Sequence, residues 1–137
     1  MKAKAKDSGL NASVFHGTLA DYTNTHSEEK FDHVVCTLVL CSVPELAPSL
    51  KEVRELLKPQ GNFVFVEHVA DKAGGIRPLM QKMLEPIFNS AAGCHCTRHT
   101  GDAVRVAGFA SVDLDYFVME QGPWPLRPHV RGIATNP

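Results

Sequence analysis

The stretch that most constrains the fold is FDHVVCTLVLCSVPELAPSLKEVRELLKPQGNFVFVEH, at residues 31–68. Residues 31–40 are nearly all apolar, which is typical of a strand covered on both faces, although a buried helix segment gives the same pattern. Leucine and valine then recur at helical spacing over 44–61, where Pro59 ends the helix. Residues 62–69 form a second predicted strand. Strand, helix and strand in this order predict a βαβ unit with a right-handed crossover, which favours the strand at 31–40.

Before this unit, the sequence ASVFHG at 12–17 predicts a short strand that ends at Gly17. Residues 18–30 are polar and predict a loop. Residues 2–8 are typical of the exposed end of a helix.

After the unit, residues 79–91 predict an amphipathic helix that is interrupted at Pro86. Residues 96–109 predict a third helix, capped at Thr97 or Thr100. The alternating pattern of 110–120 predicts a strand near a sheet edge, and 129–135 predicts a final strand after a proline-rich connection.

Length and composition limit the classes of protein to consider. A chain of 137 residues with 44% hydrophobic and 21% charged residues is typical of one globular domain. The formal net charge of −1 argues against a nucleic-acid partner. No apolar run approaches the ~18 residues of a membrane span, and the N-terminus lacks the apolar core of a signal peptide. We therefore expect an intracellular protein whose four cysteines are free thiols.

In an open α/β sheet, ligands bind beyond the carboxyl ends of the strands. This rule predicts pocket positions at 17–22, 37–43 and 67–75. In 37–43 the backbone leaves the strand, so its carbonyls and amides face the crevice; the alternative is that this segment is only core. His68 is a candidate acid or base because histidine is the residue type that titrates nearest neutral pH, and the alternative is a histidine that only caps the strand end by hydrogen bonding.

The sequence GCHCTRHT at 93–100 gathers potential metal ligands within a few residues. Its cysteines and histidines have no second CxxC or HxxxH partner, and adjacent residues do not easily surround one ion tetrahedrally. We therefore expect no metal here, and a loop that leads into a helix instead.

FDHVVCTLVLCSV, together with LKEVRELLKPQGNFVFVEHVA, resembles the class I S-adenosylmethionine-dependent methyltransferases, and among them the methyltransferase-like thiol S-methyltransferases. The likeness extends over MQKMLEPIFNSAAGCHCTRHT and PLRPHVRGIA, and covers roughly residues 12–135. It implies a Rossmann-like α/β fold. That family begins with a glycine-rich strand–loop–helix under the cofactor, which this sequence lacks. Residues 1–137 are therefore expected to form the C-terminal part of one methyltransferase domain, with strands three to seven.

The resemblance also implies site residues. The stretch that touches the adenine of S-adenosylmethionine matches Gly17, Thr18, Leu19 and Ala20, and the segment along its methionine portion matches Thr37, Leu38 and Val39. The strand end that faces the acceptor matches Glu67 and His68.

Methyl transfer needs an acceptor aligned with a sulfonium methyl group in a dry pocket. By this resemblance the partner is a small thiol or another small acceptor, with His68 as general base and Asp71 as second candidate. Cys41 is expected either to line the acceptor pocket or only to pack. The resemblance implies a cytoplasmic location for this chain, and endoplasmic reticulum or lipid droplet membranes for longer family members. The alternative is a truncated, non-catalytic chain that does not bind cofactor on its own.

Overall fold

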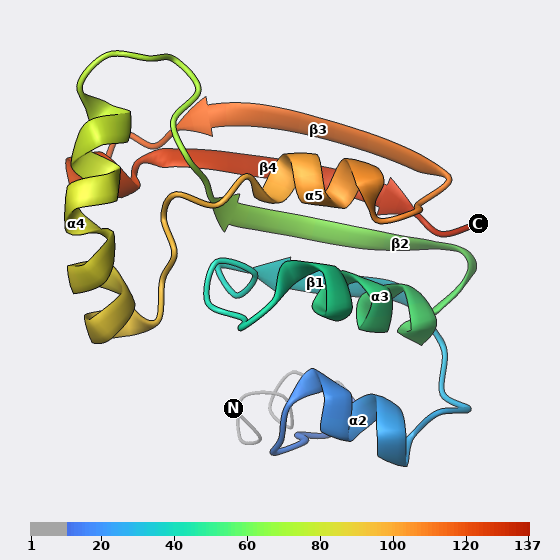
Figure 1. Ribbon diagram of the computed structural model, residues 1–137. Helices are drawn as coiled ribbons and strands as arrows, with labels where there is room; N and C mark the ends of the chain where they lie inside the picture. Colours follow the sequence, from blue (N-terminus) through green and yellow to red (C-terminus); the bar gives the residue numbers. More distant parts are fainter. Residues whose placement is uncertain (1–10) are drawn as a thin grey trace.

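The computed structural model describes residues 11–137, which form one four-stranded mixed sheet with helices beside it (Figure 1). The predicted helix end at 2–8 lies outside the described residues. In chain order, the elements are α2 (Leu19–Thr25), β1 (Phe31–Thr37), α3 (Leu46–Leu56), β2 (Leu57–His68), α4 (Arg77–Ala92), α5 (Thr100–Val106), β3 (Ser111–Val118), η1 (Trp124–Leu126) and β4 (Pro128–Thr135).

The strand order is β1-β2-β4-β3. β1 and β2 are parallel, as the predicted βαβ unit requires, and the last strand of the chain inserts between β2 and β3 with antiparallel pairing on both sides. β3 lies at one sheet edge, which confirms that prediction, and β1 forms the other edge within residues 11–137.

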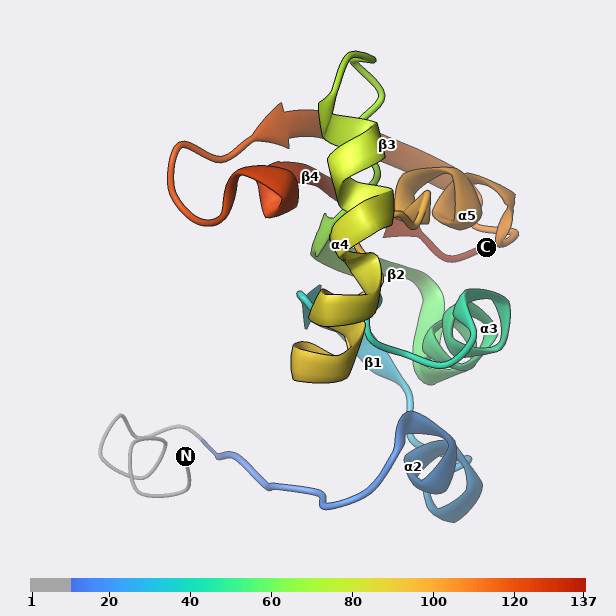
Figure 2. The same cartoon turned by 60° about the vertical axis from the view of Figure 1, so that its left-hand side comes forward.

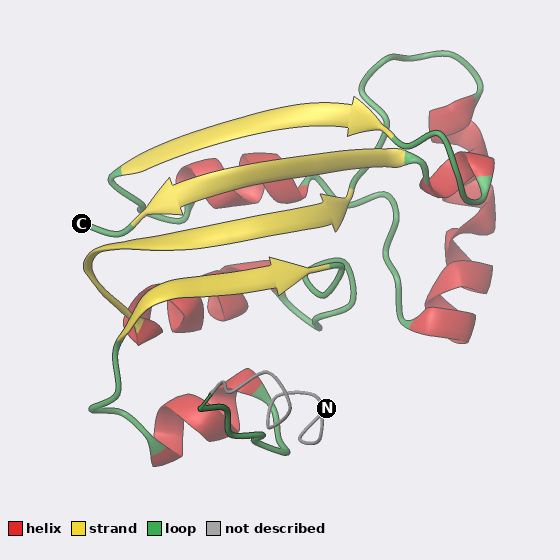
Figure 3. Cartoon of the chain, turned by 180° about the vertical axis from the view of Figure 1, so that it is seen from behind, coloured by secondary structure: helices red, strands yellow, loops and turns green. Residues whose placement is uncertain are grey.

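The core lies between the sheet and the helices α3 and α5, which cover the same face (Figures 1 and 3). Phe63 and Phe65 of β2 are fully buried there and stack with ring centroids 5.2 Å apart. Leu50 and Val53 of α3 and Val104 of α5 complete this layer, which explains the helical spacing of apolar residues in the sequence.

Helix α4 stands apart from this layer. It lies across the end of the sheet where β1 and β2 finish (Figures 2 and 3). No helix among the described residues is long and apolar enough to cross a bilayer.

The α/β fold class and the strands at 31–40, 110–120 and 129–135 are confirmed, with small shifts at their ends. The predicted helix at 44–61 ends earlier, at Leu56, and β2 begins at once. Proline disfavours the helical conformation in the residue before it, so Lys58 and Pro59 extend the strand instead.

Two predictions for the N-terminal segment are wrong. Residues 12–17 form no strand, so the sheet has four strands within residues 11–137 and not the five expected. The predicted loop at 18–30 contains helix α2. Its start is a capping box: the Asp21 N–H donates to Thr18 Oγ1, and the Thr18 N–H donates to the Asp21 carboxylate.

The two later helices also differ from expectation. Helix α4 continues through Pro86 without interruption. Pro86 has no N–H, so the Lys82 carbonyl lacks its helical hydrogen-bond donor. Both residues are exposed, and water can therefore donate to that carbonyl. Helix α5 begins after His99, which makes no side-chain capping bond, so neither Thr97 nor Thr100 caps it.

Candidate functional site

The loop that follows β1 is held by one buried carboxylate. Glu67 is fully buried near the end of β2. Its Oε1 accepts the backbone N–H groups of Val39 at 2.9 Å and Leu40 at 3.0 Å, and its Oε2 accepts that of Cys41 at 3.2 Å. Leu38 takes a positive φ of 55° at the turn out of the strand. Three consecutive amides thus bind one side chain, which fixes the loop at the carboxyl ends of the parallel strands.

A neutral thiol completes the surroundings of this carboxylate. The Cys36 thiol donates to Glu67 Oε1 at 3.3 Å. Burial, together with the charge of Glu67, raises the pKa of Cys36 to about 12, so this cysteine stays protonated as a donor. Burial also raises the pKa of Glu67, an effect that its backbone hydrogen bonds oppose.

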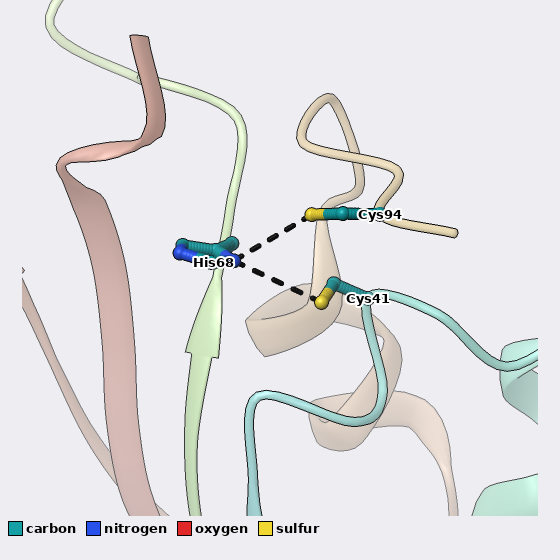
Figure 4. A group of neighbouring side chains, drawn as sticks. All are labelled: Cys41, His68 and Cys94. Atoms are coloured by element: carbon teal, nitrogen blue, oxygen red, sulfur yellow. Dashed lines mark hydrogen bonds between the residues drawn. The ribbon is translucent and has the colours of Figure 1, made fainter. Parts of the chain in front are cut away.

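A second group of side chains lies beside this loop: Cys41, His68 and Cys94, which we call the Cys–His–Cys group (Figure 4). His68 Nδ1 lies 3.8 Å from the sulfur of Cys41 and 3.5 Å from that of Cys94. A hydrogen bond from the Cys94 thiol, and then contact with His68, lowers the pKa of Cys41, whereas the same pairing raises the pKa of Cys94. The pairing therefore favours loss of a proton from Cys41 before Cys94.

Cys94 reaches this group because the chain turns sharply after α4. Gly93 ends the helix with a φ of 65°, a conformation that glycine adopts without strain. The His95 N–H then donates to the Cys41 carbonyl at 2.8 Å, which joins the two loops. The neighbouring Cys96 points elsewhere, and its thiol donates to the Gln81 carbonyl.

A second histidine ring borders the group. His129 of β4 is paired with His68 in the sheet, and the two ring centroids are 4.6 Å apart. The Nδ1–H of His129 donates to the Arg127 carbonyl at 2.8 Å, and its Nε2 is buried without a hydrogen-bond partner. Burial lowers the pKa of His129, so this ring is neutral at pH 7.

Asp71, the second candidate base, is engaged in an ion pair. Its carboxylate accepts a hydrogen bond from Arg77 at 2.9 Å and another from the Ala73 N–H at 2.9 Å, and only 7% of the side chain is exposed. These contacts tie the loop after β2 to the start of α4.

Gln81 of α4 connects the segments around the site and was not predicted to matter. The side chain is buried, and its amide nitrogen lies 3.0, 3.2 and 3.0 Å from the backbone carbonyls of Val69, Cys96 and Pro125, which belong to three separate segments. Its two N–H groups serve the three carbonyls, so one N–H is shared between two of them. Its oxygen accepts the Asp71 N–H at 2.8 Å. The sequence gives no strong signal for this role, because glutamine in an amphipathic helix is ordinarily a solvent-facing residue.

The predicted cofactor positions fall in two places. The Leu38 and Val39 side chains follow β1 and are 43% and 50% exposed, so they are not core residues, whereas the adjacent Leu40 is. Residues 17–20 lie instead at the start of α2, where Thr18 is the cap, and α2 packs against α3.

Comparison with known proteins shows which proteins this chain resembles. A family model described as "Methyltransferase domain" matches residues 1–65. The chain is 35% identical over 136 residues to the thiol S-methyltransferase TMT1B of Rattus norvegicus, and 34% identical over 140 residues to TMT1A of Homo sapiens. These matches cover 98% and 99% of this chain but 56% of each relative, so the chain spans little more than half the length of these proteins.

Solved structures with low sequence identity share the fold. The [4+2]-cyclase SpnF superimposes with a TM-score of 0.67 at 18% identity, over 99% of this chain and 60% of that one. A possible histamine N-methyltransferase from Thermotoga maritima gives 0.62 at 18% identity, over 100% and 69%. The cyclase shows that the fold alone does not determine the reaction. In sequence the chain is therefore similar to the thiol S-methyltransferases, and in fold it is similar to the solved structures named here.

Proposed function

We propose that the protein is an S-adenosylmethionine-dependent methyltransferase that acts on small thiols. The observation that carries this proposal is the likeness to thiol S-methyltransferases over nearly the whole chain, including the segments that form the site. The fold supports it, because the Glu67-bound loop and the Cys–His–Cys group both lie at the carboxyl ends of parallel strands, where such sheets bind their ligands.

The residues present suit the cofactor's methionine portion. Leu38 and Val39 offer exposed apolar side chains on a loop that Glu67 holds rigid. S-adenosylmethionine, when bound, supplies a sulfonium methyl group. The chain's own contribution is to fix that loop, orient the acceptor and exclude water.

Within this proposal, His68 is the base that accepts the proton of the acceptor thiol. A thiol with a pKa near 8.5 is only a few per cent thiolate at neutral pH, so a base contributes about 10²-fold or more. Asp71 is less suited to this role because Arg77 already pairs with its carboxylate.

The test is transfer of a labelled methyl group from S-adenosylmethionine to a small alkyl thiol, with calorimetric titration of the cofactor alongside. We expect labelled thioether from the thiol and none from the corresponding alcohol. Cofactor binding weaker than millimolar, without thioether, would contradict the proposal and favour a chain that does not bind cofactor on its own.

A substitution of His68 tests its proposed role as the base. His68→Gln should lower turnover about 10²-fold and leave cofactor affinity unchanged. The exposed His33 of β1 provides the matched control, since His33→Gln removes an imidazole away from the site. Equal turnover in the two variants would remove His68 from the mechanism.

A further inference from the structure

We propose that Cys41, His68 and Cys94 form a binding site for one Zn²⁺ ion. The three residues come from different segments: the loop after β1, the end of β2 and the turn after α4 (Figure 4). Their ligand atoms all lie within 4.8 Å of one another. Two cysteines with one histidine are a set of ligands that zinc accepts.

The distances fit a tetrahedral ion. With zinc–sulfur bonds of about 2.3 Å and zinc–nitrogen bonds of about 2.0–2.1 Å, the sulfur–nitrogen separation in a tetrahedron is about 3.6 Å. The two observed separations are 3.8 Å for Cys41 and 3.5 Å for Cys94. The two sulfurs lie within 4.8 Å of each other, against about 3.8 Å in a tetrahedron, so an ion could bind with a change of at most about 1 Å in that separation.

The three ligand atoms face a common space. Both sulfurs converge on the same atom, His68 Nδ1. That nitrogen carries either one lone pair or one N–H for two sulfurs, and Cys41 has a further contact with Ser42 Oγ at 3.6 Å. An ion placed between the three atoms satisfies the nitrogen and both sulfurs at once.

The surrounding chain holds the ligands in place before any ion binds. The Cys41 N–H is bound to Glu67, and the Cys41 carbonyl accepts the His95 N–H. His68 is fixed by its pairing with His129 across β2 and β4. These contacts limit the movement of the backbone that carries Cys41 and His68.

This site differs from the one considered for the sequence GCHCTRHT. Its ligands are distributed over the chain, with His68 lying 27 residues after Cys41 and 26 before Cys94. His95 is not among them, since it pairs with Glu85, and Cys96 binds the Gln81 carbonyl. One cysteine of that local sequence, Cys94, instead lies beside partners that spacing alone does not reveal.

Three protein ligands leave the fourth tetrahedral position to an external molecule, as in catalytic zinc sites. An acceptor thiol would occupy that position as a thiolate, its proton released to solvent. The base role of His68 described under the proposed function then belongs to the metal-free chain, because the ion would occupy His68 Nδ1. This step rests on the proposed function, whereas binding of the ion does not.

The test uses the full 137-residue chain, reduced and freed of metal by a chelator, and titrated with Co²⁺ and then Zn²⁺. We expect one Co²⁺ per chain, with a thiolate-to-cobalt charge-transfer band and the intense visible bands of tetrahedral cobalt, and loss of both on displacement by Zn²⁺. Cys94→Ser should abolish the charge-transfer spectrum at stoichiometric metal. Cys96→Ser, two residues away and also buried, should leave it intact.

A second measurement needs no variant and so does not depend on whether Cys94→Ser folds. Zn²⁺ should protect Cys41 and Cys94 from alkylation, located by peptide mass, and leave the rates at Cys36 and Cys96 unchanged. A wild-type chain without the charge-transfer band, or equal protection of all four cysteines, would overturn the proposal. Neither measurement contains a methyl donor or acceptor, so their failure is distinguishable from failure of the proposed function.

Discussion

Replacing Glu67 by glutamine tests whether its carboxylate holds the loop after β1. The two side chains have nearly the same size, so the exchange changes hydrogen bonding and charge with little change in packing. Glutamine keeps one acceptor oxygen, which can still serve Val39 and Leu40. Its amide nitrogen then faces the Cys41 N–H, and two donors oppose each other in a fully buried place.

The size of the effect follows from these contacts. A buried polar group without a partner costs about 1–3 kcal/mol, and a hydrogen bond to a charged acceptor contributes about 1.5–3 kcal/mol. Removal of the buried charge offsets part of this loss, because burial disfavours the ionised form and raises the pKa of Glu67. We therefore expect Glu67→Gln to lower the free energy of unfolding by about 2 kcal/mol, or about 30-fold in the folding equilibrium constant.

The assay is urea unfolding at pH 7, combined with amide hydrogen exchange at residues 39–41. These three amides lie outside regular secondary structure, so their slow exchange in the wild type and faster exchange in the variant would report on Glu67 directly. Glu28→Gln, at an exposed position, should stay within about 0.5 kcal/mol of the wild type. If the two variants unfold at the same urea concentration, the reasoning is refuted.

Two further predictions concern buried groups around the site. Gln81→Leu leaves three carbonyls and one N–H without a partner and should lower the free energy of unfolding by about 2–4 kcal/mol in a urea titration, whereas Met83→Leu on the exposed side of α4 should change it little. Burial lowers the pKa of His129 below 6.5 in the folded chain. As the pH falls, the imidazole is therefore protonated in the unfolded chain before it is protonated in the folded chain. The free energy of unfolding should consequently decrease as the pH drops from 7.5 to 5. His129→Gln should flatten this dependence in thermal unfolding at several pH values, and an unchanged slope would mean that another group titrates.

The βαβ unit was predictable because its signals are local and agree with one another. Apolar runs, helical spacing and Pro59 all point to the same order of elements. The start of α2 was also readable, since Thr18 and Asp21 have the spacing of a capping box. The polar composition of 18–30 outweighed that signal. Helix α4 was misjudged for a different reason, because the cost of Pro86 depends on whether water reaches the carbonyl that it leaves unpaired.

The site was only partly predictable. His68 and Glu67 follow from the rule that ligands lie at strand ends, because a strand end can be recognised in the sequence. The proximity of Cys94 to Cys41 cannot be recognised in the sequence, because it depends on the turn at Gly93 and on where α4 lies relative to the sheet. Relations between loops arise from packing of whole elements, which local pattern does not encode.

The four hydrogen bonds of Gln81 have a consequence for how the molecule opens. They join α4 to the loop after β2, to the segment before α5 and to the turn at η1, all through one side chain. None of these segments can move away from α4 without breaking at least one of these bonds. We therefore expect them to behave as one cooperative unit of local unfolding, whose amides exchange together and separately from the sheet core. Access to the end of the sheet would then be governed by a single all-or-none opening rather than by independent motions of several loops.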